Sequence, residues 1–176
     1  MRKQLMTALI ERLKHIEKDE AGNYVVATEP NPDKTVIQHF DLWNQQLDWL
    51  DEEQPFTTPA VFIEFLPIQW RHQSRGTRDA TLSINLHIVT RRNIPTRADQ
   101  QYTTEALGFL ELLDAVNLCL HGHKGENFSA LTGQTSTTDN NFDELMHSIE
   151  QYTAYIVDHS GSMPQNKVAA GLIVEI

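Results

Sequence analysis

Apolar residues recur at helical spacing in two segments of the chain, one within residues 2–18 and one across residues 99–121. The apolar positions are Leu5, Leu9, Leu13 and Ile16 in the first segment and Ala106, Phe109, Leu110, Leu113, Val116 and Leu120 in the second. Each pattern predicts an amphipathic helix. Gly122 follows the second segment directly and predicts where that helix ends.

Two segments in the middle of the chain predict strands with different surroundings. Residues 60–66, which follow Pro59, are apolar on both faces, and this is typical of a strand inside a sheet. Residues 80–89 alternate between apolar and polar side chains, which predicts one packed face and one face that is wet or lies in an interface. Polar residues 71–79 separate the two segments, so we expect an antiparallel hairpin with a long loop.

The remaining segments complete the expected architecture. Further strands are predicted at residues 24–27, 130–137 and 145–157, whereas residues 35–50 fit either a strand or a helix. Hairpins interleaved with helices favour an α+β domain, with a mostly antiparallel or mixed sheet and helices packed on one face. We expect this single domain to span residues 1–158 and to be followed by a C-terminal extension, residues 159–176.

Charge is distributed unevenly along the chain. The net charge of −10 argues against a general binder of nucleic acid or of anionic membranes, because an acidic surface repels both. Residues 71–97 nevertheless contain six arginines against one aspartate. Cys119 is the only cysteine, so no internal disulfide is possible and a reducing compartment is expected. No apolar run reaches the roughly 18 residues that a membrane span requires, so no membrane partner is expected.

The sequence shows no pattern that requires an enzyme or a cofactor. The G-x-S-x-G, G-x-G-x-x-G and P-loop motifs are absent, and Cys119 lies within the apolar stripe of the second predicted helix. Trp43, Trp49 and Trp70 are interpreted as core or interface anchors, with a ligand pocket beside one of them as another possibility. The expected class is therefore a non-catalytic protein.

Two sets of residues leave a metal-binding domain or metal-dependent enzyme as the alternative. His121 and His123 form an H-x-H pair that a third ligand could complete. The segment Asp139–Glu150 places acidic or amide side chains at the first, third, fifth and twelfth positions of a calcium-loop pattern. Glu144 stands where that pattern requires glycine, and this favours an ordinary polar turn before a strand.

Arginine is concentrated in the predicted loop, at Arg71, Arg75 and Arg78. The three side chains could form a solvated loop tip. They could instead contact an acidic neighbour, including another copy of this acidic protein, or a DNA backbone. No aromatic stacking platform lies within the loop, which disfavours recognition of single-stranded nucleic acid.

Five successive elements together resemble the tail terminator and tail-completion proteins of long-tailed bacteriophages. They are LMTALIERLKHIE, TPAVFIEFLPIQW, DATLSINLHIVTRR, the leucine-rich helix and ELMHSIEQYTAYIVD, and they cover residues 1–158 in order. The resemblance implies a small α+β fold, assembly into a six-membered ring that caps the tail tube and joins it to the head, and no active site. The chain departs from the family by a longer insert at residues 28–56 and by residues 159–176.

The resemblance also implies partners and a location. The expected partners are further copies of the chain, the tail tube protein and a head-completion protein, with DNA passing through the ring lumen. The expected location is the virion tail, assembled in the bacterial host cytoplasm. Within a head-to-tail ring, we expect the arginine hairpin to meet an acidic patch such as Asp51, Glu52 and Glu53 on the next copy. Arginines facing the lumen are the other possibility, although they would retain DNA phosphates.

Overall fold

A computed structural model of the chain describes residues 1–49, 56–74, 76–92, 100–141 and 144–161. The elements, in chain order, are α1 (Arg2–Leu13), β1 (Ile16–Lys18), β2 (Tyr24–Val26), β3 (His39–Leu42), the 3-10 helix η1 (Gln46–Trp49), β4 (Ala60–Phe65), β5 (Arg71–Ser74), β6 (Thr77–Arg91), α2 (Gln100–Leu120), β7 (Thr132–Asp139) and β8 (Leu145–Asp158).

Six strands form one mixed sheet in which most pairs are antiparallel. The order is β3-β4-β6-β8-β7, and β5 pairs with the start of β6. Only β3 and β4 run parallel among the named strands of this sheet. The long strands β6 and β8 form its spine, from Arg78 opposite Asp158 to Arg91 opposite Leu145. β1 and β2 form a separate antiparallel hairpin.

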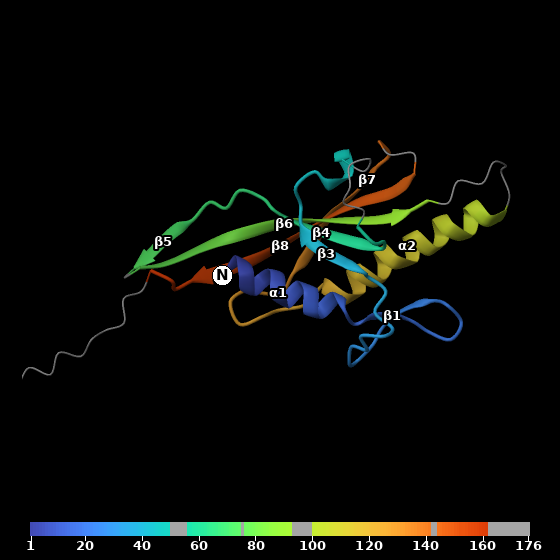
Figure 1. The fold of residues 1–176 in the computed structure, drawn as a ribbon. Helices are drawn as coiled ribbons and strands as arrows, with labels where there is room; N and C mark the ends of the chain where they lie inside the picture. Colours follow the sequence, from blue (N-terminus) through green and yellow to red (C-terminus); the bar gives the residue numbers. More distant parts are fainter. Residues whose placement is uncertain (50–55, 75, 93–99, 142–143, 162–176) are drawn as a thin grey trace, which may run out of the picture.

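Both helices pack against one face of this sheet (Figure 1). Alternate residues of β4, β6 and β8 point toward the helices, because side chains of a strand alternate between faces. The buried residues on this side include Leu5, Leu9 and Leu13 of α1, Leu112, Val116 and Leu120 of α2, and Val61, Ile63, Leu82, Ile84, Leu86, Ile88, Tyr152 and Ile156 of the sheet. The predicted α+β class, with helices on one face of a mostly antiparallel sheet, is confirmed.

The opposite face is covered by the segment that follows β3. Leu47 of η1 is buried there with Phe62 of β4 and Leu145 of β8, and Trp43 and Phe56 pack against this second cluster. β4 is therefore buried on both faces within one chain. The apolar character of residues 60–66 needs no neighbouring subunit to explain it.

Two predicted segments differ from the structure. The first helix ends at Leu13, and Ile16 lies in β1, where it is fully buried. Ile16 continues the helical spacing of the first segment, but its position in β1 buries it equally well. The predicted long loop contains β5 and the first residues of β6, which pair with each other, so the loop prediction was wrong for residues 71–74 and 77–79. Residues 35–50 contain both a strand, β3, and a short helix, η1.

Candidate functional site: an arginine arm and a buried histidine chain

β5 and the ends of β6 and β8 beside it form an arm that extends beyond the helices (Figure 1). We define the arm as Arg71–Ser74, Thr77–Ala80 and Ile156–Asp158. Gly76 has a φ of +80°, a backbone conformation that L side chains rarely adopt, and it allows the tight turn between β5 and β6. The arm places Arg71 and Arg78 at the end of the sheet where β5, β6 and β8 lie side by side.

Arg71 lies on the face of the arm away from the helices and binds a buried aspartate. Its Nε donates to Asp79 Oδ1 (3.1 Å) and its Nη2 to Asp79 Oδ2 (3.4 Å). The Tyr155 hydroxyl and the Gln73 side-chain amide also donate to this carboxylate. The Tyr155 hydrogen bond is the main cause that lowers the pKa of Asp79, and Gln73 and Arg71 add to it. The Arg71 side chain remains 70% exposed.

Arg78 lies on the other face of the arm and is held more completely. Its Nε and Nη2 donate to Asp158 Oδ2 (2.9 and 2.8 Å), and its guanidinium carbon lies 4.2 Å from the centre of the Trp70 ring. The backbone N–H of Ser160 donates to Asp158 Oδ1. This N–H and then Arg78 lower the pKa of Asp158 to about 2. Arg78 therefore ties β6 to the end of β8.

These contacts predict different consequences for the two arginines. Arg78→Ser leaves the buried Asp158 without its cation and should lower stability by about 1–2 kcal/mol. For a chain of this size, each kcal/mol of lost stability lowers Tm by roughly 2–4 °C. Arg71→Ser should change Tm far less, because Asp79 keeps the Tyr155 and Gln73 hydrogen bonds and the Arg71 side chain is largely exposed. Thermal unfolding followed by circular dichroism tests the contrast, and equal Tm values for both variants would contradict it.

The predicted contact residues are only partly within the described chain. Arg71 and Arg78 share the arm but lie on opposite faces, so they do not form a single patch. Arg75 and the acidic group Asp51, Glu52 and Glu53 lie outside the described residues. The contact expected between these acids and the arginines stays a prediction.

The structure separates the candidate ligands of both predicted metal sites. His121 Nδ1 accepts from the backbone N–H of Gly133 (3.4 Å) beside β7, whereas the His123 ring lies 6.0 Å from that of Phe128. Burial and the nearby Arg12 and His15 lower the pKa of His123. The two imidazoles therefore have separate surroundings.

The calcium-loop residues are also separated. Asp139 contacts His147 on the face covered by Trp43, whereas Glu150 contacts Ser136 and Ser148 on the face covered by the helices. The sheet lies between the two carboxylates. Across the described ranges, no group of three or more His, Cys, Asp or Glu side chains has an arrangement that could hold a metal ion.

A chain of four titratable side chains crosses the sheet beneath Trp43. Asp139 Oδ2 lies 3.2 Å from His147 Nδ1, His147 Nε2 lies 3.0 Å from His87 Nδ1, and His87 Nε2 lies 3.3 Å from Glu64 Oε2. The strands β7, β8, β6 and β4 each contribute one residue. We call this set the histidine chain.

Both imidazoles of the histidine chain are buried. His87 and His147 are only 4% and 1% exposed. Trp43 stacks on His87 with ring centres 3.8 Å apart and planes 3° from parallel. Burial is the largest cause that lowers the pKa of each histidine, while Glu64 and Asp139 oppose it.

The number of hydrogens in the histidine chain makes it sensitive to protonation. Its three contacts need three hydrogens, and two neutral imidazoles supply two. One added proton supplies the third hydrogen, so that all three contacts become hydrogen bonds. A second added proton would place an N–H of His87 against an N–H of His147, and these two groups repel each other. The alternation of residues 80–89 predicts that His87 faces away from Leu86 and Ile88. It does not predict the partners of His87, because these lie on strands far apart in the sequence.

A comparison with protein-family models finds no matching family, and a search of curated proteins finds no significant match. The fold and these two sites are therefore the basis for a functional proposal. Within the described part of the chain, no helix is long and apolar enough to cross a membrane.

Proposed function

We propose that this protein is a structural subunit of a long-tailed phage virion, in which copies form a ring that caps the tail tube and joins it to the head. The arm is the observation that supports this proposal most strongly. Its strands extend past the helices that cover the rest of the sheet (Figure 1), and the Arg71 side chain on it is 70% exposed. An extended two-faced arm is well suited to contact a second copy.

Other exposed features are consistent with a subunit that has several neighbours. Leu107, Leu110 and Leu118 are exposed on α2, and Tyr155 is exposed at the base of the arm. Large apolar side chains that gather on one surface often mark protein contacts. The proposed neighbours are further copies of the chain, the tail tube protein and a head-completion protein, with DNA passing through the lumen. The α+β fold and the resemblance of residues 1–158 to phage tail proteins are consistent with this proposal.

Removing the arm arginines tests assembly. The triple variant Arg71→Ser, Arg75→Ser, Arg78→Ser should form fewer rings, because residues 71–78 lose their three positive charges in an acidic protein. We expect subunit association about tenfold weaker or more, measured by light scattering after size exclusion. Electron micrographs of the wild-type protein mixed with tail tubes should show rings of uniform diameter on tube ends.

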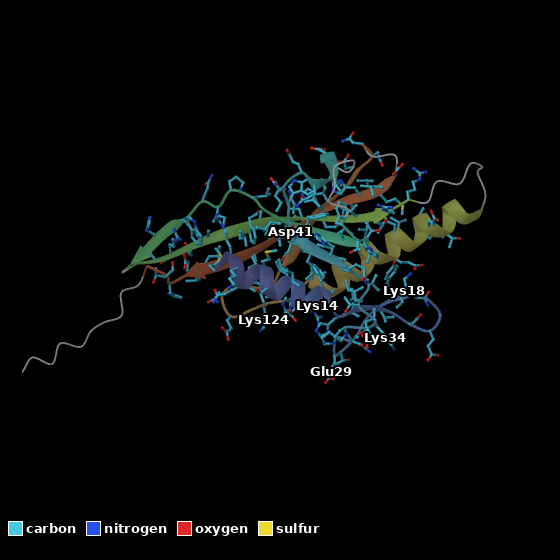
Figure 2. The ribbon with its side chains drawn as sticks, in the orientation of Figure 1. Lys14, Lys18, Glu29, Lys34, Asp41 and Lys124 are labelled. Carbon is cyan, nitrogen blue, oxygen red and sulfur yellow. The ribbon has the colours of Figure 1, made fainter. Side chains whose placement is uncertain are left out.

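A matched variant controls for net charge. Lys3→Ser, Lys34→Ser, Lys124→Ser also removes three positive charges, all of them on exposed side chains that are not part of the arm (Lys34 and Lys124 in Figure 2). This control should assemble as the wild type does. Wild-type rings from the arginine variant at low protein concentration and high salt would contradict the role of the arm. A wild-type protein that never assembles, with or without tubes, would contradict the proposed function itself.

A further inference from the structure

A groove of about 670 Å³ lies between α2 and the strands β7 and β8. Leu110 and Leu113 of α2 line one wall together with Asp114, and Ser136 of β7 lines the other. Glu150 and Tyr152 of β8 also line the groove. The groove thus combines an apolar wall with two carboxylates.

Glu150 is the unusual group in this groove. It is only 7% exposed, and its two oxygens accept from the hydroxyls of Ser136 and Ser148. None of the ion pairs among the described residues includes it. Its charge contributes, after burial, to the raised pKa of Tyr152. A buried carboxylate that has only neutral donors is poorly compensated, so a cation in the groove would be bound favourably.

We propose that this groove binds a guanidinium group, and that its occupant is Arg71 from the arm of a second copy. This inference rests on the proposed ring. The aliphatic stem of an arginine would pack on Leu113 and on Leu110, which is 54% exposed. Its planar head would reach Glu150 and Asp114, and guanidinium groups bind carboxylates in this way.

Arg71 has donors to spare for such a contact. It uses two of its nitrogens on Asp79 and also lies within hydrogen-bonding reach of Tyr155, but a guanidinium has five N–H donors and the Arg71 side chain is 70% exposed. Arg78 is a poorer occupant, since Asp158 and Trp70 already hold its guanidinium. Asp79 retains Tyr155 and Gln73 if Arg71 also turns toward a neighbour.

The arm and the groove lie at different places along the sheet. β5 pairs with β6 around Asp79, which faces Val157 near the end of β8. β7, by contrast, pairs with β8 between His147 and Thr153. One copy can therefore donate its arm and accept another arm at the same time. Such a contact between two different surfaces is head-to-tail, and it closes into a ring if the rotation between copies allows.

Charge-neutral variants of the groove provide the first test. Glu150→Gln keeps the size of the side chain, and Asp114→Asn changes an exposed position of α2. Each should weaken association of full-length subunits about tenfold and reduce its dependence on salt. The control Glu29→Gln, Asp41→Asn removes two exposed acids outside the groove (both labelled in Figure 2) and should assemble as the wild type does.

A charge exchange identifies the occupant. Arg71→Glu and Asp114→Arg should each weaken assembly, and combining both in one chain should restore it in part. If wild-type rings form and both neutral groove variants assemble with wild-type affinity and salt dependence, the groove inference is wrong while the proposed ring stands. Loss of assembly in each single variant without recovery in the combined one would exclude Arg71 as the occupant. A wild-type chain that never associates would overturn both proposals together.

Discussion

Trp43→Ala should destabilise the protein by about 2–3 kcal/mol, less than the roughly 3–5 kcal/mol lost when a fully buried aromatic residue becomes alanine. Trp43 is partly exposed, but its indole stacks on His87 and contacts the edge of Phe62 with ring centres 6.0 Å apart. The substitution removes these contacts and opens one side of the histidine chain to water. Urea unfolding of the variant and the wild type measures the loss.

The same substitution should change the titration of His87. Burial is the main cause of its lowered pKa, so hydration should move that pKa upward toward the value of a free histidine. Trp43→Phe retains an aromatic ring over His87 and should lose less stability and shift the pKa less. Histidine resonances followed by NMR across pH 4–8 provide the measurement. Unchanged stability together with an unchanged His87 titration would show that Trp43 does not cover the chain in solution.

Acidification should destabilise the folded protein, starting below about pH 6.5. The pKa values of His87 and His147 are lower in the folded chain than in the unfolded chain, so the unfolded chain takes up protons first as the pH falls. The free energy of unfolding is therefore highest above the pKa that the two histidines have in the unfolded chain. Below that pKa it falls by about 1.4 kcal/mol per pH unit for each proton taken up. The decline ends once the folded state also binds its protons.

The position of the two histidines explains why the effect should be large. The second proton opposes the 3.0 Å contact between them, and this contact joins β6 to β8 at the centre of the sheet. The pKa of Asp158, about 2 in the folded state, adds a separate loss only below about pH 4, where the unfolded aspartate takes up its proton.

Two variants test whether His87 and His147 cause the acid sensitivity. His87→Gln, His147→Gln should flatten the dependence of stability on pH between 6.5 and 4, even if it lowers stability at neutral pH. His72→Gln changes an exposed histidine of the arm and should keep the wild-type slope. A double variant with the wild-type slope would mean that other groups cause the acid sensitivity.

Much of the fold could be predicted because its signals are local. The stripe that became α2 and the alternation that became β6 each depend on residues a few positions apart. The glycine after α2 is a local signal too, since Gly122, two residues after the helix ends at Leu120, adopts a φ of +80°. Local patterns gave the wrong element where either a helix or a strand would bury the same residue, as at Ile16. They also failed at β5, whose polar residues form a strand because β6 continues beside them.

The candidate sites required the tertiary structure. The sequence alone determined the helices and main strands, the uneven distribution of charge and the arginine-rich segment. The pairing of distant strands decided which side chains meet. The register of β7 on β8, including its irregularity between Gly133 and Thr135, places Asp139 beside His147 and Ser136 beside Glu150, on opposite faces. Strand pairing is set by packing of the whole sheet rather than by neighbours along the chain, so neither the histidine chain nor the acidic groove could be read from residue spacing.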